Sequence, residues 1–137
     1  MPALKTLADT QSTTHAPQTY GELVHFVHVY IVEPHPIGSP SPYSGQLWET
    51  SYDNDQPVDM AGRVSNAQDL LAAEPANLAG QLLLIDDLSP GQNNPMWCSY
   101  GHCPNCAFLI GQDGRIDTTQ LWFGADDMRS AFDDLLE

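Results

Sequence analysis

Short apolar runs divide the 137-residue chain and predict β-strands at residues 24–32, 81–85, 107–111 and 115–121. The first two runs are almost continuously apolar, which is typical of strands that are covered on both faces. Asp113 and Gly114 lie between the last two runs, and this dipeptide is a strong signal for a tight hairpin turn. We therefore expect the third and fourth strands to pair antiparallel.

Other segments carry helical signals. Ser65 and Gln68 match a capping box, so the pattern predicts a helix that begins near Ser65 and ends or bends at Pro75. A second helix is predicted over residues 125–136, where one face gathers the apolar side chains of Met128, Phe132, Leu135 and Leu136. A shorter helical turn is expected before Gly101.

The order strand, helix, strand, strand, strand, helix predicts an α/β domain. A helix between the first two strands makes them parallel, and the hairpin then completes a mixed sheet with helices on both faces. Residues 1–18 are polar and predict a loosely held N-terminal arm, which leaves residues 19–137 for the domain. Residues 33–62 are rich in Pro and Gly and are expected to form a long loop.

The chain is strongly acidic, with 4 Lys and Arg residues, 18 Asp and Glu residues and a formal net charge of −14. So few cations argue against nucleic acid or an anionic membrane as a partner, because both bind through Lys and Arg. The sequence shows neither an apolar membrane span nor a secretory signal, so we expect a soluble, cytoplasmic protein. Paired carboxylates at 86–87, 126–127 and 133–134 are interpreted as solvated charges or first-turn helix charges.

The three Cys residues, Cys98, Cys103 and Cys106, lie within nine residues. Cys103, Pro104, Asn105 and Cys106 form a C-P-x-C pattern that looks like a glutaredoxin-type dithiol. In such a dithiol, neighbouring thiols exchange with a substrate disulfide. Here the pattern precedes a strand and not a helix, so it lacks activation by a helix dipole.

The same segment has a second interpretation as a metal site. Cys98, His102, Cys103 and Cys106 supply three thiolates and one imidazole, a ligand set that holds Zn²⁺ in tetrahedral geometry. The spacing of the thiols also resembles the start of a plant-type ferredoxin loop, but no fourth Cys follows. The residues by themselves leave the redox pair and the zinc site open.

Three segments, taken in order, resemble the iodothyronine deiodinase-like branch of the thioredoxin-fold superfamily. The first is YGELVHFVHVYIVEPH at residues 20–35, and the second is the helical segment VSNAQDLLAA followed by a strand that ends in Asp. The third is YGHCPNCAFLIGQDGRI at residues 100–116. The resemblance covers about residues 19–136 and implies a thioredoxin-like fold.

The resemblance also implies roles for single residues. Glu33 and His35 match the family's Glu-x-His, which lies beside the reactive centre, and Pro104 matches a Pro that is usually cis and faces the catalytic thiol. The family's nucleophile would lie upstream of Tyr20, yet residues 1–19 contain no Cys. The resemblance therefore implies a chain that is N-terminally truncated relative to the family, lacks its first strand and nucleophile, and has no iodothyronine deiodinase activity.

These residues together predict a thioredoxin-like protein with a thiol–disulfide redox role. Cys103 and Cys106 would react, Pro104 would shape the site, and Glu33 and His35 would flank it. The expected partner is a redox protein or a small thiol. The alternative is a non-catalytic subunit or zinc-binding module that uses the fold for association.

The missing family strand bears on assembly. In the resembled fold it lies between the first and third strands of this chain, and buried unpaired backbone groups are costly. Residues 3–8, with the sequence ALKTLA, are the upstream segment with enough apolar character to take its place. The other solution is an element from a second subunit, so we expect a homodimer or a hetero-complex.

Overall fold

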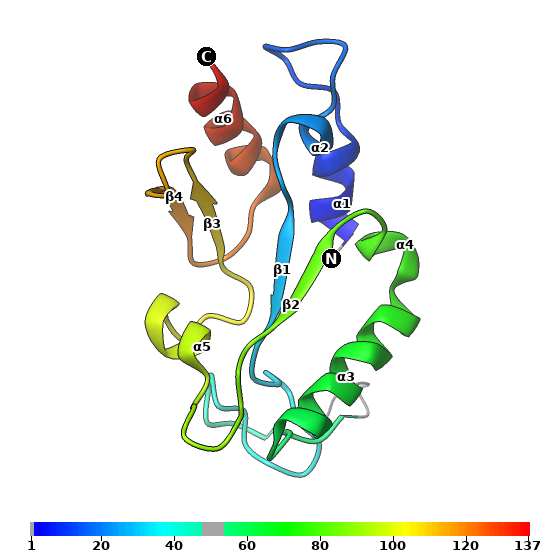
Figure 1. The fold of residues 1–137 in the computed structure, drawn as a ribbon, viewed down its shortest axis with the longest axis vertical. Coiled ribbons are helices and arrows are strands. Elements are labelled where there is room, and N and C mark those ends of the chain that lie inside the picture. The colour runs from blue at the N-terminus through cyan, green and yellow to red at the C-terminus, as the bar shows by residue number, and fades with distance from the viewer. Residues whose placement is uncertain (1, 48–53) are drawn as a thin grey trace. The chain divides into compact units, whose positions relative to one another are not determined.

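The computed structural model describes residues 2–47 and 54–137. The helices are α1 (Pro2–Asp9), α2 (Tyr20–Leu23), α3 (Met60–Ala73), α4 (Pro75–Leu78), α5 (Pro95–Tyr100) and α6 (Ala125–Leu136). The strands are β1 (Val27–Tyr30), β2 (Leu82–Ile85), β3 (Ala107–Ile110) and β4 (Ile116–Gln120) (Figure 1). The chain forms two compact units. Unit 1 comprises Met1–Val27, Ala76–Leu82 and Asn105–Glu137, and unit 2 comprises His28–Pro75 and Leu83–Pro104.

The strands form two separate two-stranded sheets, β1 with β2 and β3 with β4 (Figure 1). The Leu82 N–H donates to the Phe26 carbonyl at the start of β1 and β2. The Asp86 N–H donates to the Tyr30 carbonyl at their end, so both strands advance in the same direction and are parallel. β3 and β4 are antiparallel. The α/β class and both strand pairings are confirmed, but the predicted single mixed sheet is replaced by two small sheets, because no described strand joins them.

The core of unit 1 lies between helices and the β3–β4 hairpin. Its buried side chains come from α1, α2, β3 and α6 and are Leu7, Tyr20, Leu109, Met128 and Phe132. The Phe132 ring lies 5.5 Å from the Tyr20 ring and 5.7 Å from the Phe26 ring, which it meets edge-on. Aromatic pairs at these distances add to the hydrophobic stabilisation. The predicted C-terminal helix is confirmed, including the buried positions of Met128 and Phe132.

The N-terminal segment differs from the loosely held arm that the sequence predicted. Residues 2–9 form α1, whose Leu7 and Ala8 are buried in unit 1. Lys5 and Asp9 form an ion pair one helical turn apart. The segment 3–8 is therefore part of a helix and does not replace a strand, because Ala, Leu and Lys favour the helix and its apolar residues recur at helical spacing.

Helix α3 begins five residues before the predicted start at Ser65. Asp59 is the N-cap residue, and its side chain accepts a hydrogen bond of 2.9 Å from the Gly62 N–H. Ser65 lies inside the helix, because Asp59 already caps the helix N-terminus upstream of it. The helix ends at Ala73, so the prediction that it stops at Pro75 is confirmed. The long loop expected over residues 33–62 lies partly outside the described residues.

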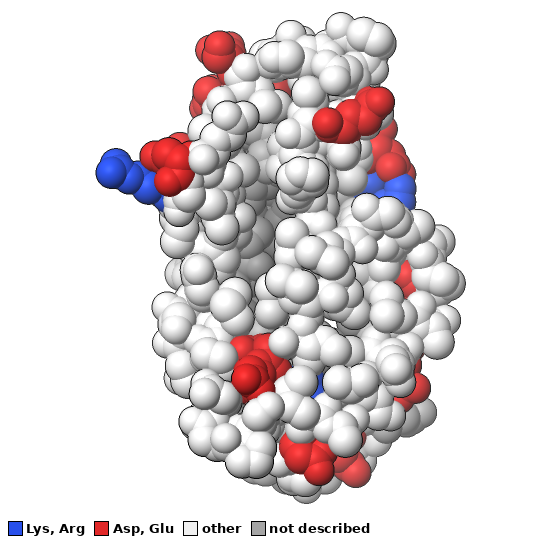
Figure 2. Space-filling view, viewed as in Figure 1, with Lys and Arg blue, Asp and Glu red and all other residues white. Residues whose placement is uncertain are grey.

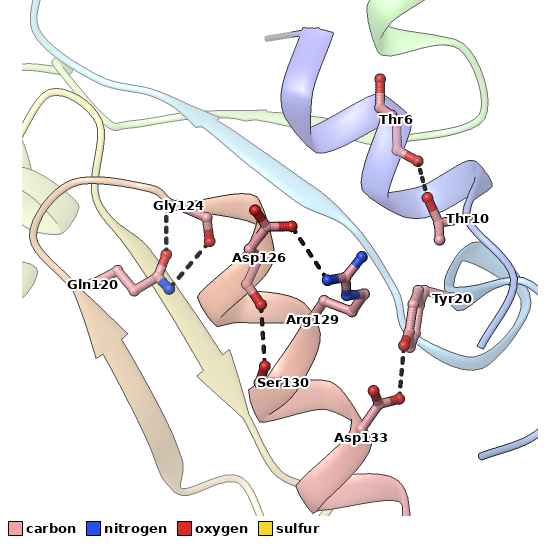
Figure 3. Close-up of polar contacts among 9 residues, drawn as sticks. All are labelled: Thr6, Thr10, Tyr20, Gln120, Gly124, Asp126, Arg129, Ser130 and Asp133. Atoms are coloured by element: carbon pink, nitrogen blue, oxygen red, sulfur yellow. Dashed lines mark hydrogen bonds and ion pairs between the residues drawn. The ribbon is translucent and has the colours of Figure 1, made fainter. Parts of the chain in front are cut away.

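One polar contact stands inside the aromatic core of unit 1. The buried Tyr20 hydroxyl donates a hydrogen bond of 2.6 Å to Asp133 Oδ1 on α6 (Figure 3). Hydrogen bonds from Thr13 and from Tyr20 lower the pKa of Asp133. A carboxylate that is stabilised in this way contributes stability above its unfolded pKa of about 3.9, and the contribution is lost as the pH falls through the folded pKa.

Tyr20→Phe is expected to lower the free energy of unfolding by about 1.5–3 kcal/mol at pH 7, the range for a hydrogen bond to a charged group. The difference from wild type should shrink as the pH falls below 4, because the protonated Asp133 is a weaker acceptor. Urea denaturation at both pH values measures it. Tyr43→Phe is the matched control, since Tyr43 is 49% exposed. Equal stability of wild type and Tyr20→Phe at pH 7 would contradict the argument.

Candidate functional site

Cys103 and Cys106 are joined in a disulfide. The bridge spans only Pro104 and Asn105. Cys103 is buried, with 7% of its surface exposed, whereas Cys106 is half-buried and Asn105 is exposed. Cys103 Sγ contacts the Gly101 carbonyl oxygen at 3.7 Å. A disulfide sulfur carries no hydrogen, so this contact becomes a hydrogen bond only after reduction.

The segment before the disulfide is held in place by helix α5. Pro95 occupies the first turn of α5, where a missing N–H costs nothing. The next two amides find their acceptor on a distant residue: Met96 N–H donates to Asp86 Oδ1 over 2.9 Å and Trp97 N–H donates to Asp86 Oδ2 over 3.0 Å. Asp86 therefore caps α5 from the end of β2. The predicted helical turn before Gly101 is confirmed.

Asp86 corrects an expectation from the sequence. The pair at 86–87 was interpreted as solvated, but Asp86 is only 2% exposed and also accepts the Asp87 N–H over 3.0 Å. The buried Arg63 of α3 donates from Nη1 to the Asp86 carbonyl oxygen over 3.1 Å. Burial lowers the pKa of Arg63, and the nearby Asp86 charge opposes that change. The hydrogen bonds that Asp86 accepts from backbone amides and from the buried Arg63 offset the cost of burying it.

His102 stacks on Trp97 within unit 2. Their ring centroids lie 4.9 Å apart and the ring planes differ by 11°. Trp97 is buried and His102 is exposed, so the stack anchors the residue that precedes Cys103 to α5. The remaining thiol, Cys98, is free and exposed on α5, where it contacts the Asn93 carbonyl oxygen at 3.4 Å.

The proposed zinc ligands do not form a cluster. Across residues 2–47 and 54–137, no group of three or more His, Cys, Asp or Glu side chains is arranged to hold a metal ion. Two of the three sulfurs are engaged in the disulfide, and a disulfide sulfur is not the thiolate that zinc requires. A site formed by Cys98, His102, Cys103 and Cys106 remains a prediction for the reduced protein.

Glu33 and His35 lie in the loop that follows β1, in unit 2. Glu33 is buried, and its Oε2 accepts a hydrogen bond of 2.7 Å from the Tyr30 hydroxyl. The Gln56 side chain braces the Glu33 backbone by accepting from its N–H over 3.0 Å and donating to its carbonyl over 3.1 Å. Burial and the bond to Glu33 raise the pKa of Tyr30, which therefore stays a neutral donor. His35 is half-buried.

Pro104 departs from what the resemblance implied. Within the described residues the cis peptide bond is Ala16–Pro17, so the bond between Cys103 and Pro104 is trans. The trans isomer is the lower-energy one for a bond to proline, by about 0.5–1 kcal/mol. The expectation of a cis Pro104 is therefore wrong.

A backbone irregularity lies opposite Cys106, within unit 1. Ala107 on β3 faces Gln120 on β4. Beyond this pair, the Phe123 N–H donates to the Asn105 carbonyl over 2.8 Å. Cys106 is the single residue between these two contacts on the segment that leads into β3. On the segment that follows β4, two residues lie between the same two contacts. The strand ladder itself ends at the Ala107–Gln120 pair, and residues 121–122 form a bend that lies opposite Cys106.

The two residues opposite Cys106 are Leu121 and Trp122. Their side chains are among the most exposed large apolar groups that the structure describes, at 76% and 68%. The sequence predicted Leu121 as the last residue of the strand over 115–121, whereas β4 ends at Gln120. A signal was present, because the alternating pattern of β4 gives way to three consecutive large apolar residues at 121–123. Such a run cannot bury every side chain on one strand face.

Comparison of the chain with known protein families, with characterised proteins and with solved structures finds no significant match. Of the helices that the structure describes, none combines the length and the apolar character that crossing a membrane requires.

Proposed function

We propose that this protein is a thioredoxin-like thiol–disulfide exchange protein whose reactive pair is Cys103 and Cys106. The observation that carries the proposal is a disulfide across two residues in which one sulfur is buried and the other is half-buried. The α/β elements and the resemblance to deiodinase-like proteins support the thioredoxin-like assignment. The resemblance puts the family's nucleophile upstream of Tyr20, where this sequence has no Cys, so the thiols available for exchange are those of Cys98, Cys103 and Cys106.

A disulfide that closes a four-residue loop stabilises the folded state only weakly. The loss of chain entropy that it imposes on the unfolded state corresponds to about 2 kcal/mol, less than the roughly 3 kcal/mol of a 15-residue loop. The segments on its two sides are held independently, by the capped helix α5 before it and by the β3–β4 ladder after it. Opening the bond therefore leaves most of the surrounding contacts intact, which suits a pair that cycles.

The exchange begins at the more accessible sulfur. An external thiolate attacks Cys106 Sγ, the Cys103–Cys106 bond breaks, and the electron pair leaves with Cys103 Sγ, which takes a proton from solvent. A second external thiolate attacks the substrate sulfur of the mixed disulfide and releases Cys106. Two substrate thiols thereby become one disulfide while the protein disulfide becomes two thiols.

Thiol trapping tests this function. Wild-type protein treated with dithiothreitol and then alkylated should carry three labels, and the oxidised protein should carry one, on Cys98. Reoxidation should restore the single label without forming oligomers. A disulfide that resists millimolar dithiothreitol in the folded protein, or that does not re-form, would contradict the proposal. Protection of the reduced thiols by added Zn²⁺, reversed by a chelator, would instead support the zinc-binding alternative.

A further inference from the structure

The Leu121–Trp122 segment is held at both ends by hydrogen bonds although its side chains are exposed. The Gln120 side chain spans the segment: Oε1 accepts from the Gly124 N–H over 2.9 Å and Nε2 donates to the Gly124 carbonyl over 3.3 Å (Figure 3). With the Phe123 bond to Asn105, these contacts fix both ends of the three-residue segment 121–123. An exposed apolar surface that is already ordered loses little entropy when a partner covers it.

The charge distribution restricts what that partner can be. Lys5, Arg115 and Arg129 are each paired with an Asp side chain, and the remaining cation, Arg63, is buried. With a net charge of −14, the protein presents acidic side chains at several places on the face shown in Figure 2. An anionic thiol such as glutathione is repelled by this field, as is a second copy of the chain, whereas a cationic substrate is attracted.

We infer that the substrate of Cys106 is a cysteine-bearing polypeptide segment with apolar and basic residues, and that Leu121 and Trp122 are its docking surface. The inference rests on the proposed exchange function. The backbone contacts place Leu121 and Trp122 opposite Cys106, so a polypeptide that covers their exposed side chains lies beside the reactive bond. Trp is among the residues that most often dominate binding energy at protein interfaces.

The test compares rates of reduction of the oxidised full-length protein by three thiols at equal concentration. They are dithiothreitol, glutathione, and a capped peptide with one Cys between Leu and Phe and an Arg at each end. Trp122→Ala and Leu121→Ala are the test variants, and Val58→Ala is the matched control, because Val58 is 92% exposed and lies in unit 2. Added NaCl varies the electrostatic contribution.

The peptide should reduce wild type faster than glutathione does, and Trp122→Ala should slow the peptide about tenfold, in the range for loss of one aromatic anchor. Reduction by dithiothreitol should change less than about twofold in every variant, since it makes no use of a docking surface. Salt should slow the peptide reaction and speed the glutathione reaction. Val58→Ala should match wild type throughout.

The outcomes separate this inference from the proposed function. If dithiothreitol reduces the disulfide reversibly but Trp122→Ala and Leu121→Ala leave the peptide rate unchanged, the exchange function stands and the docking surface is wrong. If glutathione reacts faster than the peptide at low salt, the charge argument is wrong. Sedimentation of wild type and Trp122→Ala tests whether a second copy of the chain occupies this surface instead. A dimer that dissociates on substitution would assign the surface to that second copy.

Discussion

Asp86→Ala is expected to lower the free energy of unfolding by about 3–5 kcal/mol, because it leaves buried partners without their acceptor. The substitution removes the acceptor of three backbone amides, those of Asp87, Met96 and Trp97. It also removes the Asp86 charge, which has the largest of the charge effects that raise the pKa of the buried Arg63. A domain of this size is stable by only about 5–15 kcal/mol, so the loss is a large fraction of the total.

Denaturation by urea measures the effect, with the disulfide kept oxidised. Asp134→Ala is the matched control, because Asp134 is an exposed carboxylate on α6 and its loss should change stability by less than about 0.5 kcal/mol. Asp86→Asn serves if the Ala variant does not fold, since it keeps one acceptor oxygen and should lose less. Equal stability of Asp86→Ala and Asp134→Ala would show that solvent, and not Asp86, satisfies the amides of α5.

The second large effect concerns the order of the two thiols. In a Cys98→Ser background, Cys103→Ser is expected to form a mixed disulfide through Cys106 at least about tenfold faster than Cys106→Ser forms one through Cys103, because accessible thiols exchange faster than buried ones. Cys103 is 7% exposed and contacts Gly101, whereas Cys106 is half-buried. The assignment is the reverse of the usual order in C-x-x-C proteins, where a helix dipole activates the first Cys.

A pyridyl disulfide reagent measures both rates by release of its chromophore. The same two variants should be indistinguishable once unfolded in guanidinium chloride, where burial no longer separates the thiols. Equal rates in the folded state, or faster reaction of Cys103, would overturn the assignment of Cys106 as the entry sulfur while leaving a redox role for the pair intact.

Local signals predicted the C-terminal half of the fold well. The Asp113–Gly114 turn, the two apolar runs beside it and the helix over residues 125–136 all depend on neighbours in the chain, and each is confirmed. The helix start near Ser65 was wrong for a local reason as well. Asp59 is an equally good cap and precedes Ser65, so the helix begins at Met60.

The candidate site was predictable only in part. The spacing of Cys103 and Cys106 indicated a dithiol pair; the structure joins them in a disulfide, and their cycling stays a prediction. The burial of Asp86 was not predictable, because its acceptor role depends on α5 being brought to the end of β2. Asp86 and Asp134 are the same residue type, and only their surroundings in the fold make one a buried helix cap and the other an exposed carboxylate.

The amino-acid sequence by itself therefore determined the four strands, the helices α3, α5 and α6, the acidic charge and the proximity of the two thiols. These properties arise from residues within a few positions of each other or from composition. Only the tertiary structure decided that the strands form two separate sheets and that Cys103 is the more buried sulfur. It alone placed the exposed Leu121 and Trp122 opposite Cys106. The physical reason is that burial and strand register are set by contacts between distant segments, which local propensity does not encode.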